Sequence, residues 1–192
     1  MIRVIIGAAA AAVAMVIVGF IFFATPLSRL HVGSLDNMQA ATVQQTLAAN
    51  LPATGTYQVP SSDSAEQAVM YGRGPIATVH YNTRGYSADD PSMMLGGLLF
   101  DFVVALLIGT ALIGIDRRVT DFASRARLVV LLCVAAAAFM HLGEPIWYHH
   151  DWGHFVYLFI ADAVALSVGG LIIARWFLPR VRTAPAGAPT DV

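Results

Sequence analysis

Four long apolar stretches alternate with polar segments along this chain of 192 residues. A helix needs about 20 apolar residues to cross the hydrocarbon core of a bilayer. The pattern predicts spans over residues 1–25, 92–116, 128–145 and 154–178. The third is short and can gain length from Ala123–Arg127 or from the segment after His141. We therefore expect a membrane all-α fold, a four-transmembrane-helix bundle. The first span is predicted to be a retained signal anchor, because its apolar run is longer than that of a cleaved signal peptide.

Residues 26–91, between the first and second spans, have a different pattern. The sequence pattern predicts a helix from Ser34 to Ala49, followed by a short strand over Gly55–Pro60. A second short helix ending near Tyr71 and a second strand over Ile76–Tyr81 follow. These signals predict a small α+β insert outside the membrane. The first of its helices is expected to bury one face, formed by Leu35, Met38, Thr42 and Leu47.

Composition supports the assignment to a membrane. The chain is 57% hydrophobic and 12% charged, whereas soluble domains carry about 25% charged residues. A net charge of −1 gives no reason to expect a nucleic-acid partner. All eleven basic residues are arginine, a bias typical of GC-rich bacterial genomes. The single cysteine, Cys133, excludes an internal disulfide.

The arginines predict how the spans are oriented. Residues 117–127 form a predicted cytoplasmic loop, whereas the loop over 146–153 has no arginine. Short cytoplasmic loops carry an excess of basic residues. We therefore expect a bacterial inner-membrane protein with cytoplasmic termini, a periplasmic segment 26–91 and a disordered Pro/Ala-rich tail over 179–192. The arginines on the cytoplasmic side are Arg3, Arg117, Arg118, Arg125, Arg127, Arg175, Arg180 and Arg182.

Ionisable residues lie inside the predicted spans. Asp101 and Asp162 are each about nine residues from the outer end of their helix, or ~12–14 Å deep at 1.5 Å per residue. His141 and Glu144 fall near the outer end of the third span. An aspartate at a helix centre costs ~2.5–3.5 kcal/mol on insertion scales, so it is normally paired. We expect Asp101, His141, Glu144 and Asp162 to form an intramembrane polar cluster, in which the two carboxylates share a proton or His141 is their partner.

Small residues predict which helix faces pack together. Gly97, Ala105 and Gly109 share a stripe with Asp101, and Ala165 and Gly169 lie near Asp162. Membrane helices approach closely at such positions. The polar cluster should therefore face the bundle.

Several roles are open for these polar residues. They can form hydrogen bonds between helices, contact a partner subunit, bind a metal, haem or pigment, relay protons or take part in catalysis. His141 and Glu144 are three residues apart and His150 and His154 four apart, spacings that a metal permits. The possible metal or cofactor ligands are His141, His149, His150 and His154.

Recognisable catalytic patterns are missing. The chain has no Gly-x-Ser-x-Gly, no His-Glu-x-x-His and no glycine-rich phosphate loop. The absence of these patterns favours a non-enzymatic role and leaves enzymatic activity as an open alternative. The favoured function is a non-enzymatic accessory or scaffolding subunit of a larger bacterial membrane complex, respiratory or photosynthetic. Its partners would be the lipid bilayer and other membrane subunits. The alternatives are a cofactor-binding membrane protein and an oligomeric proton-coupled transporter.

One local pattern suggests relatives. Leu51-Pro52, Thr54–Pro60 and Met70–Ala77, followed by three spans, resemble a group of uncharacterised bacterial four-helix inner-membrane proteins with a small periplasmic insert. The resemblance implies this topology and does not imply any activity.

Overall fold

The computed structural model describes residues 2–178 and contains four helices long and apolar enough to cross a membrane. The four are α1 (Ile2–Phe23), α4 (Pro91–Ile115), α5 with its continuation α6 (Phe122–His141 and Gly143–Tyr148), and α7 (Trp152–Ile172) with a final π-helical turn, η2 (Ile173–Phe177). This confirms the predicted helical protein with four candidate transmembrane helices. The predicted disordered tail 179–192, with Arg180 and Arg182, lies outside the described residues.

The third span begins earlier than the sequence suggested. Asp121 is the N-cap of α5, and its Oδ1 accepts a hydrogen bond from the backbone N–H of Ser124 at 2.8 Å. This bond lowers the pKa of the Asp121 carboxyl. The helix therefore starts at Phe122, six residues before the predicted start at 128, and includes Arg125 and Arg127.

The short turn between α4 and α5 is held by a buried arginine. Arg125 is 3% exposed. Its Nε donates to the carbonyl of Val119 at 2.7 Å, and one of its terminal nitrogens donates to the carbonyl of Asp116 at 3.3 Å. These bonds satisfy backbone carbonyls of the turn that follows α4. Arg125 therefore contributes to the structure of the turn as well as to the charge of this end of the bundle.

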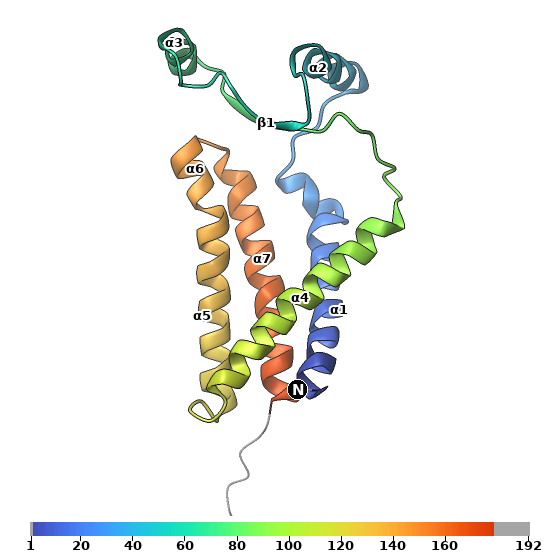
Figure 1. Ribbon diagram of the computed structural model, residues 1–192, viewed down its shortest axis with the longest axis vertical. Helices are drawn as coiled ribbons and strands as arrows, with labels where there is room; N and C mark the ends of the chain where they lie inside the picture. Colours follow the sequence, from blue (N-terminus) through green and yellow to red (C-terminus); the bar gives the residue numbers. More distant parts are fainter. Residues whose placement is uncertain (1, 179–192) are drawn as a thin grey trace, which may run out of the picture. The chain divides into compact units, whose positions relative to one another are not determined.

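The transmembrane helices pack as a chain of pairs. Helix α1 packs against α4 and α7, and α5 packs against α7 (Figure 1). Although α4 and α5 are neighbours in sequence, they make almost no contact with each other. Figure 1 shows α4 crossing α1 obliquely, so that its first turns diverge from α1.

Glycines allow the close approaches between these helices. A Cβ on Gly109 would lie 2.6 Å from Val4, one on Gly169 2.6 Å from Met15, and one on Gly170 2.5 Å from Val129. Ala105 is fully buried, and Ala165 is half-buried. Gly97, in contrast, is exposed, and a Cβ there would meet nothing within 4 Å. The expected packing role of Gly97 is therefore absent in this structure, because the first turns of α4 diverge from α1.

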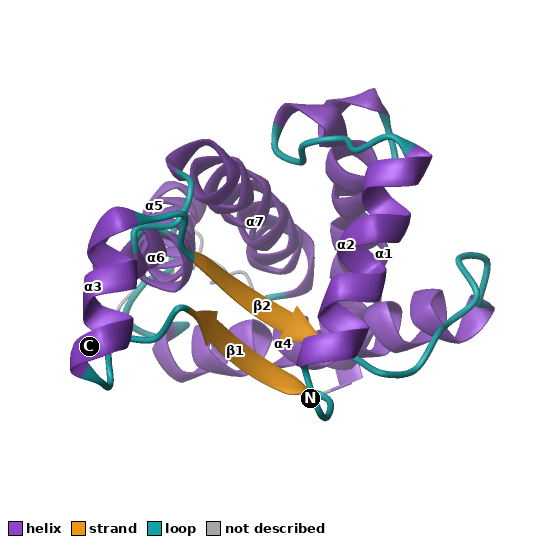
Figure 2. Cartoon of the chain, turned by 90° about the horizontal axis from the view of Figure 1, so that it is seen from above, coloured by secondary structure: helices purple, strands orange, loops and turns teal. Residues whose placement is uncertain are grey.

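The insert, Val32–Asp90, forms a second compact unit. Its helices are α2 (Asn37–Asn50) and α3 (Ala65–Arg73), and its strands are β1 (Gly55–Val59) and β2 (Ala77–Tyr81). The strands pair antiparallel, with Gly55 opposite Tyr81 and Val59 opposite Ala77 (Figure 2). The predicted α+β succession is therefore present as a two-stranded sheet with two helices.

The expected buried face of the first insert helix is absent. Helix α2 buries no residue, Met38 is 80% exposed, and Leu47 is half-buried. Asp36 and Gln39 form a capping box at its start, so the helix is fixed locally by its cap. The two-stranded sheet of this small unit provides little apolar surface against which α2 could pack.

Candidate functional site

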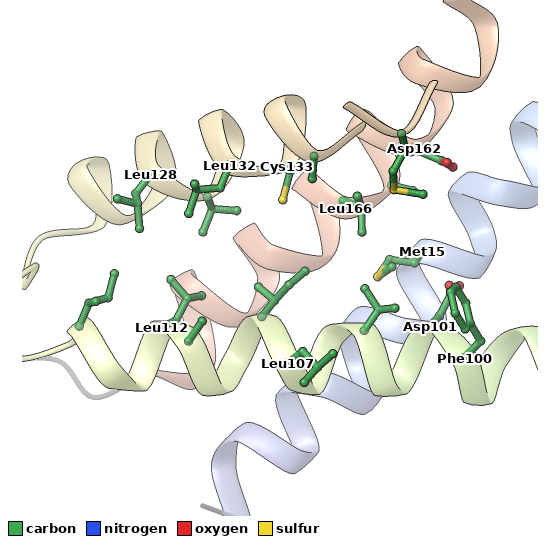
Figure 3. A pocket seen from close by; sticks show the side chains of 18 residues that line it. Met15, Phe100, Asp101, Leu107, Leu112, Leu128, Leu132, Cys133, Asp162 and Leu166 are labelled. Atoms are coloured by element: carbon green, nitrogen blue, oxygen red, sulfur yellow. The ribbon is translucent and has the colours of Figure 1, made fainter. Parts of the chain in front are cut away.

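An apolar groove lies between α4 on one side and α5 and α7 on the other, with Met15 of α1 also in its wall (Figure 3). Its volume is about 550 Å³, within the range of about 300–1,000 Å³ that is typical of ligand pockets. The groove exists because α4 packs on α1 while α5 packs on α7, which leaves the space between α4 and α5 unfilled. It is open at the side, since Leu107 and Leu132 line it and are still 66% and 62% exposed.

The groove is elongated and almost entirely apolar. Along α4 its lining extends from Phe100 to Ile115, which is about 22 Å at 1.5 Å per residue. Its shape therefore matches an extended hydrocarbon chain better than a compact polar molecule. Sixteen apolar or sulfur-containing side chains line it: Met15, Phe100, Val104, Leu107, Ile108, Ala111, Leu112, Ile115, Leu128, Val129, Leu132, Cys133, Ala136, Met140, Ala165 and Leu166.

Two carboxylates occupy one end of the groove. Asp101 on α4 and Asp162 on α7 both line it, and Figure 3 shows them toward the same end, away from Leu112 and Leu128. Both side chains are half-buried. Within residues 2–178, the Asp101 carboxylate accepts no hydrogen bond. We call Asp101 and Asp162, together with His141, the acid end of the groove.

His141 joins the acid end from α5. Its Nε2 lies 2.7 Å from Oδ2 of Asp162, a distance at which a ring N–H donates a strong hydrogen bond to a carboxylate. The His141 side chain is 14% exposed and the Asp162 side chain 37% exposed. The structure thus brings together three members of the expected cluster: two as a hydrogen-bonded pair, and Asp101 as a second carboxylate on the wall of the same groove.

The fourth expected member, Glu144, makes a different contact. Helix α5 ends at His141, and α6 begins at Gly143, so Glu144 follows a break in the helix. Its Oε2 lies 3.3 Å from Nδ1 of His150, and it does not line the groove. The His150 ring stacks between the rings of Tyr148 and Phe155. The structure therefore separates Glu144 from the other three residues of the expected cluster.

A third contact joins the start of α7 to the segment after α1. Nδ1 of His154 lies 3.0 Å from both Nδ1 and the carbonyl oxygen of His31. The His31 ring stacks on Tyr157, whose hydroxyl donates to the carbonyl of Phe22 at 2.6 Å. Partial burial, followed by the neighbouring His154 imidazole, lowers the pKa of His31 from its usual value of 6.5. The sequence pattern did not single out this pairing, because its partners are 123 residues apart.

The histidines proposed as metal ligands do not converge. His141, His150 and His154 each contact a different partner, and His149 is exposed at the end of α6 in a left-handed conformation with φ of 56°. Among the described residues, no group of three or more His, Cys, Asp or Glu side chains is placed to hold a metal ion.

The buried glycines Gly7 and Gly170 are packing positions that sequence reasoning missed. A Cβ on Gly7 would lie 2.7 Å from the Phe177 ring, and one on Gly170 2.5 Å from Val129. Gly170 was detectable as the neighbour of Gly169. Gly7 stands in an alanine-rich run, where nothing in the sequence distinguishes its contact with Phe177.

Comparison with protein-family models, curated proteins and solved structures finds no match for this chain.

Proposed function

We propose that this chain is a non-enzymatic subunit of a larger membrane complex, and that it holds a lipid-soluble molecule in the groove between α4 and α5. The observation that carries the proposal is the groove itself: about 550 Å³ of apolar space with polar groups at one end only. Ligand pockets typically combine an apolar lining with a few polar groups that fix orientation. The apolar part of the ligand would lie along α4, with its head group at the acid end.

The role as a subunit is supported by the surfaces that the helices leave uncovered. Only 17% of the residues in the apolar windows of α4 and of α5 are buried within the chain. Large apolar side chains such as Phe139 and Leu95 are 89% and 68% exposed. Lipid can cover these side chains, and so can the helices of neighbouring subunits. Respiratory and photosynthetic complexes are the proposed setting, because their membrane subunits work beside lipid-soluble cofactors.

The groove supports ligand binding better than transport. A proton-coupled transporter needs polar groups along the path of its substrate. Along α4 the lining is apolar from Val104 to Ile115, and the two carboxylates are confined to one end. A path for protons through this groove would therefore end at Asp101 and Asp162.

We further propose that the chain lies in a bacterial inner membrane with residues 26–91 in the periplasm. The N-terminal end of α1 packs beside η2, where Gly7 meets Phe177, so the two ends of the described helical unit lie together. Arg3, Arg125 and Arg175 all belong to this end of the helices. By the positive-inside rule, this end faces the cytoplasm.

Filling the groove tests the proposal. Ala136 lines the groove, whereas Ala135, its neighbour on α5, is exposed outside it. Ala136→Phe places a ring in the groove, and Ala135→Phe adds the same bulk to another face of the helix. Each protein is expressed at its native level and purified in mild detergent. The co-purifying proteins are identified, and the bound lipid-soluble compounds are extracted and identified by mass spectrometry.

The wild type and Ala135→Phe should carry one discrete amphipathic compound per chain together with other membrane subunits, and Ala136→Phe should lose the compound. The same extractable lipids in all three proteins would contradict a specific ligand. Purification of the wild type without other subunits would contradict the role in a complex.

A further inference from the structure

The acid end of the groove has an excess of negative charge when its carboxylates are ionised. Asp101 has no hydrogen-bond partner among the described residues, and Asp162 is paired with His141. If His141 is a protonated, cationic imidazolium, its charge balances that of one carboxylate and leaves the other unbalanced. If His141 is neutral, it balances the charge of neither carboxylate. An ionised carboxylate in apolar surroundings without a counter-charge is unfavourable.

Within the described helical unit, residues 2–31 and 91–178, no arginine is paired with Asp101. The arginines of the described membrane helices lie at the opposite end from Asp101. Arg3 lies in the first turn of α1, Arg125 and Arg127 lie in the first turns of α5, and Arg175 lies in the π-helical turn η2. Arg125 is engaged with backbone carbonyls of the α4–α5 turn. Arg29 follows α1 in the 3₁₀ turn Pro26–Leu30, where it is exposed.

We infer that the groove binds a lipophilic cation: a molecule with a hydrocarbon chain and an amine or other cationic head that pairs with Asp101. This inference rests on the proposed function, because it names the class of ligand for the same groove. The hydrocarbon chain lies along the apolar wall from Val104 to Ile115, and the head reaches the acid end. A cation there compensates the carboxylate that His141 leaves unpaired. Lateral opening of the groove lets such a molecule enter from the membrane.

Charge complementarity distinguishes this ligand from a neutral lipid. A neutral chain of the same length fills the groove equally well but leaves the charge at the acid end unbalanced. An anionic chain adds a third negative group beside Asp101 and Asp162, which like-charge repulsion disfavours. The order of binding should therefore be cation, then neutral chain, then anion.

The test compares three spin-labelled chains of equal length in nanodiscs that contain the full chain: stearylamine, stearyl alcohol and stearic acid. Electron paramagnetic resonance measures the fraction of each probe that the protein immobilises. The wild type should hold the amine about fivefold more strongly than the alcohol, the size expected for one partly exposed charge pair. The acid should be held least.

Variants of Asp101 test whether its carboxylate causes the preference for the amine over the alcohol. Asp101→Asn should reduce the preference for the amine over the alcohol to about one, within the accuracy of the spectra. Asp101→Glu should keep the preference because it keeps the charge. Asp89→Asn, which removes the same charge from an exposed position in the insert, should behave like the wild type. Circular dichroism of each variant verifies that the helices have formed.

Equal binding of the amine and the alcohol by the wild type would overturn the inference and leave the groove as a site for neutral chains. A preference for the amine that survives Asp101→Asn would overturn it as well, because a group other than the Asp101 carboxylate would then attract the amine. If the wild type holds none of the probes better than Ala136→Phe does, the groove does not bind hydrocarbon chains, and the proposed function fails with the inference.

Discussion

His141 on α5 and Asp162 on α7 are joined across the bundle by a distance of 2.7 Å between Nε2 and Oδ2. The pair lies beside the groove, and Asp162 itself lines the groove wall. The contact thus has two consequences. It links the two helices that form one side of the groove, and it fixes the orientation of a carboxylate on the groove wall.

A double-mutant cycle should detect this link. Asp162→Asn and His141→Gln each weaken the hydrogen bond, and the coupling free energy between them should be about 1 kcal/mol, as for hydrogen bonds between membrane helices. The free energy of unfolding is measured by steric trapping in bicelles. The pair Glu144→Gln and His141→Gln is the control, because Glu144 contacts His150 instead. Zero coupling between His141 and Asp162 would show that the contact is absent in the membrane.

The buried glycines should differ in their tolerance to alanine. Gly170→Ala places a methyl group 2.5 Å from Cγ1 of Val129, whose β-branched side chain has little freedom, and should lower the free energy of unfolding by about 1–3 kcal/mol. Gly169→Ala meets the flexible thioether of Met15 and should cost less. At Gly19 a Cβ meets nothing within 4 Å, so Gly19→Ala should change the stability by less than about 0.5 kcal/mol. A Gly170→Ala variant as stable as Gly19→Ala would contradict the helix packing.

Acidification should weaken the contact between His31 and His154. The pKa of His31 is lowered in the folded chain, so the unfolded chain binds more protons in the pH range just below 6.5. The stabilisation from neutral His31 is therefore fully present above pH 6.5 and is lost as the pH falls through that range.

The melting temperature measured in nanodiscs from pH 7.5 to 5 should therefore fall more for the wild type than for His31→Phe. The phenyl ring keeps the stacking on Tyr157 but does not titrate. His80→Gln, in the insert, serves as the matched control and should follow the wild type. An equal fall in His31→Phe would assign the pH dependence to other groups.

Cysteine labelling tests the proposed orientation. In a Cys133→Ala background, Asp89→Cys places a thiol in the insert and Thr120→Cys places one in the turn between α4 and α5. A membrane-impermeant maleimide added to cells with a permeabilised outer membrane should label position 89. Position 120 should react only after the inner membrane is opened. The reverse pattern would contradict the periplasmic location of the insert.

The sequence predicted the membrane helices well because their signal is local: long runs without charge identify α1, α4 and α7 directly. The start of α5 was missed because Ser124, Arg125 and Arg127 look like loop residues, and only the structure shows Arg125 bonded to the preceding turn. Counting residues along each helix put His141 and Asp162 in the same half of the membrane, and the structure places their side chains in contact. The same reasoning failed for Glu144, because the break between α5 and α6 changes the helix face after His141.

The groove itself could not be predicted from the sequence. A short connection normally joins helices that pack side by side, and the turn from Asp116 to Asp121 suggests this for α4 and α5. Instead, Gly109 brings α4 onto α1 and Gly170 brings α5 and α7 together. The space between α4 and α5 follows from these two separate pairings, which depend on contacts between distant parts of the chain.

The most direct test of the groove as a binding site is photo-crosslinking from its wall in living cells. The crosslinking amino acid p-benzoylphenylalanine replaces Leu107, which lines the groove, or Val103, which is exposed on α4 outside it. After illumination, the intact mass of the purified chain reveals what has been attached. Position 107 should gain the mass of one discrete amphipathic compound, and position 103 should gain only bulk phospholipid or neighbouring subunits. The same phospholipid mixture at both positions, or a protein-sized adduct at position 107, would contradict a ligand-binding groove.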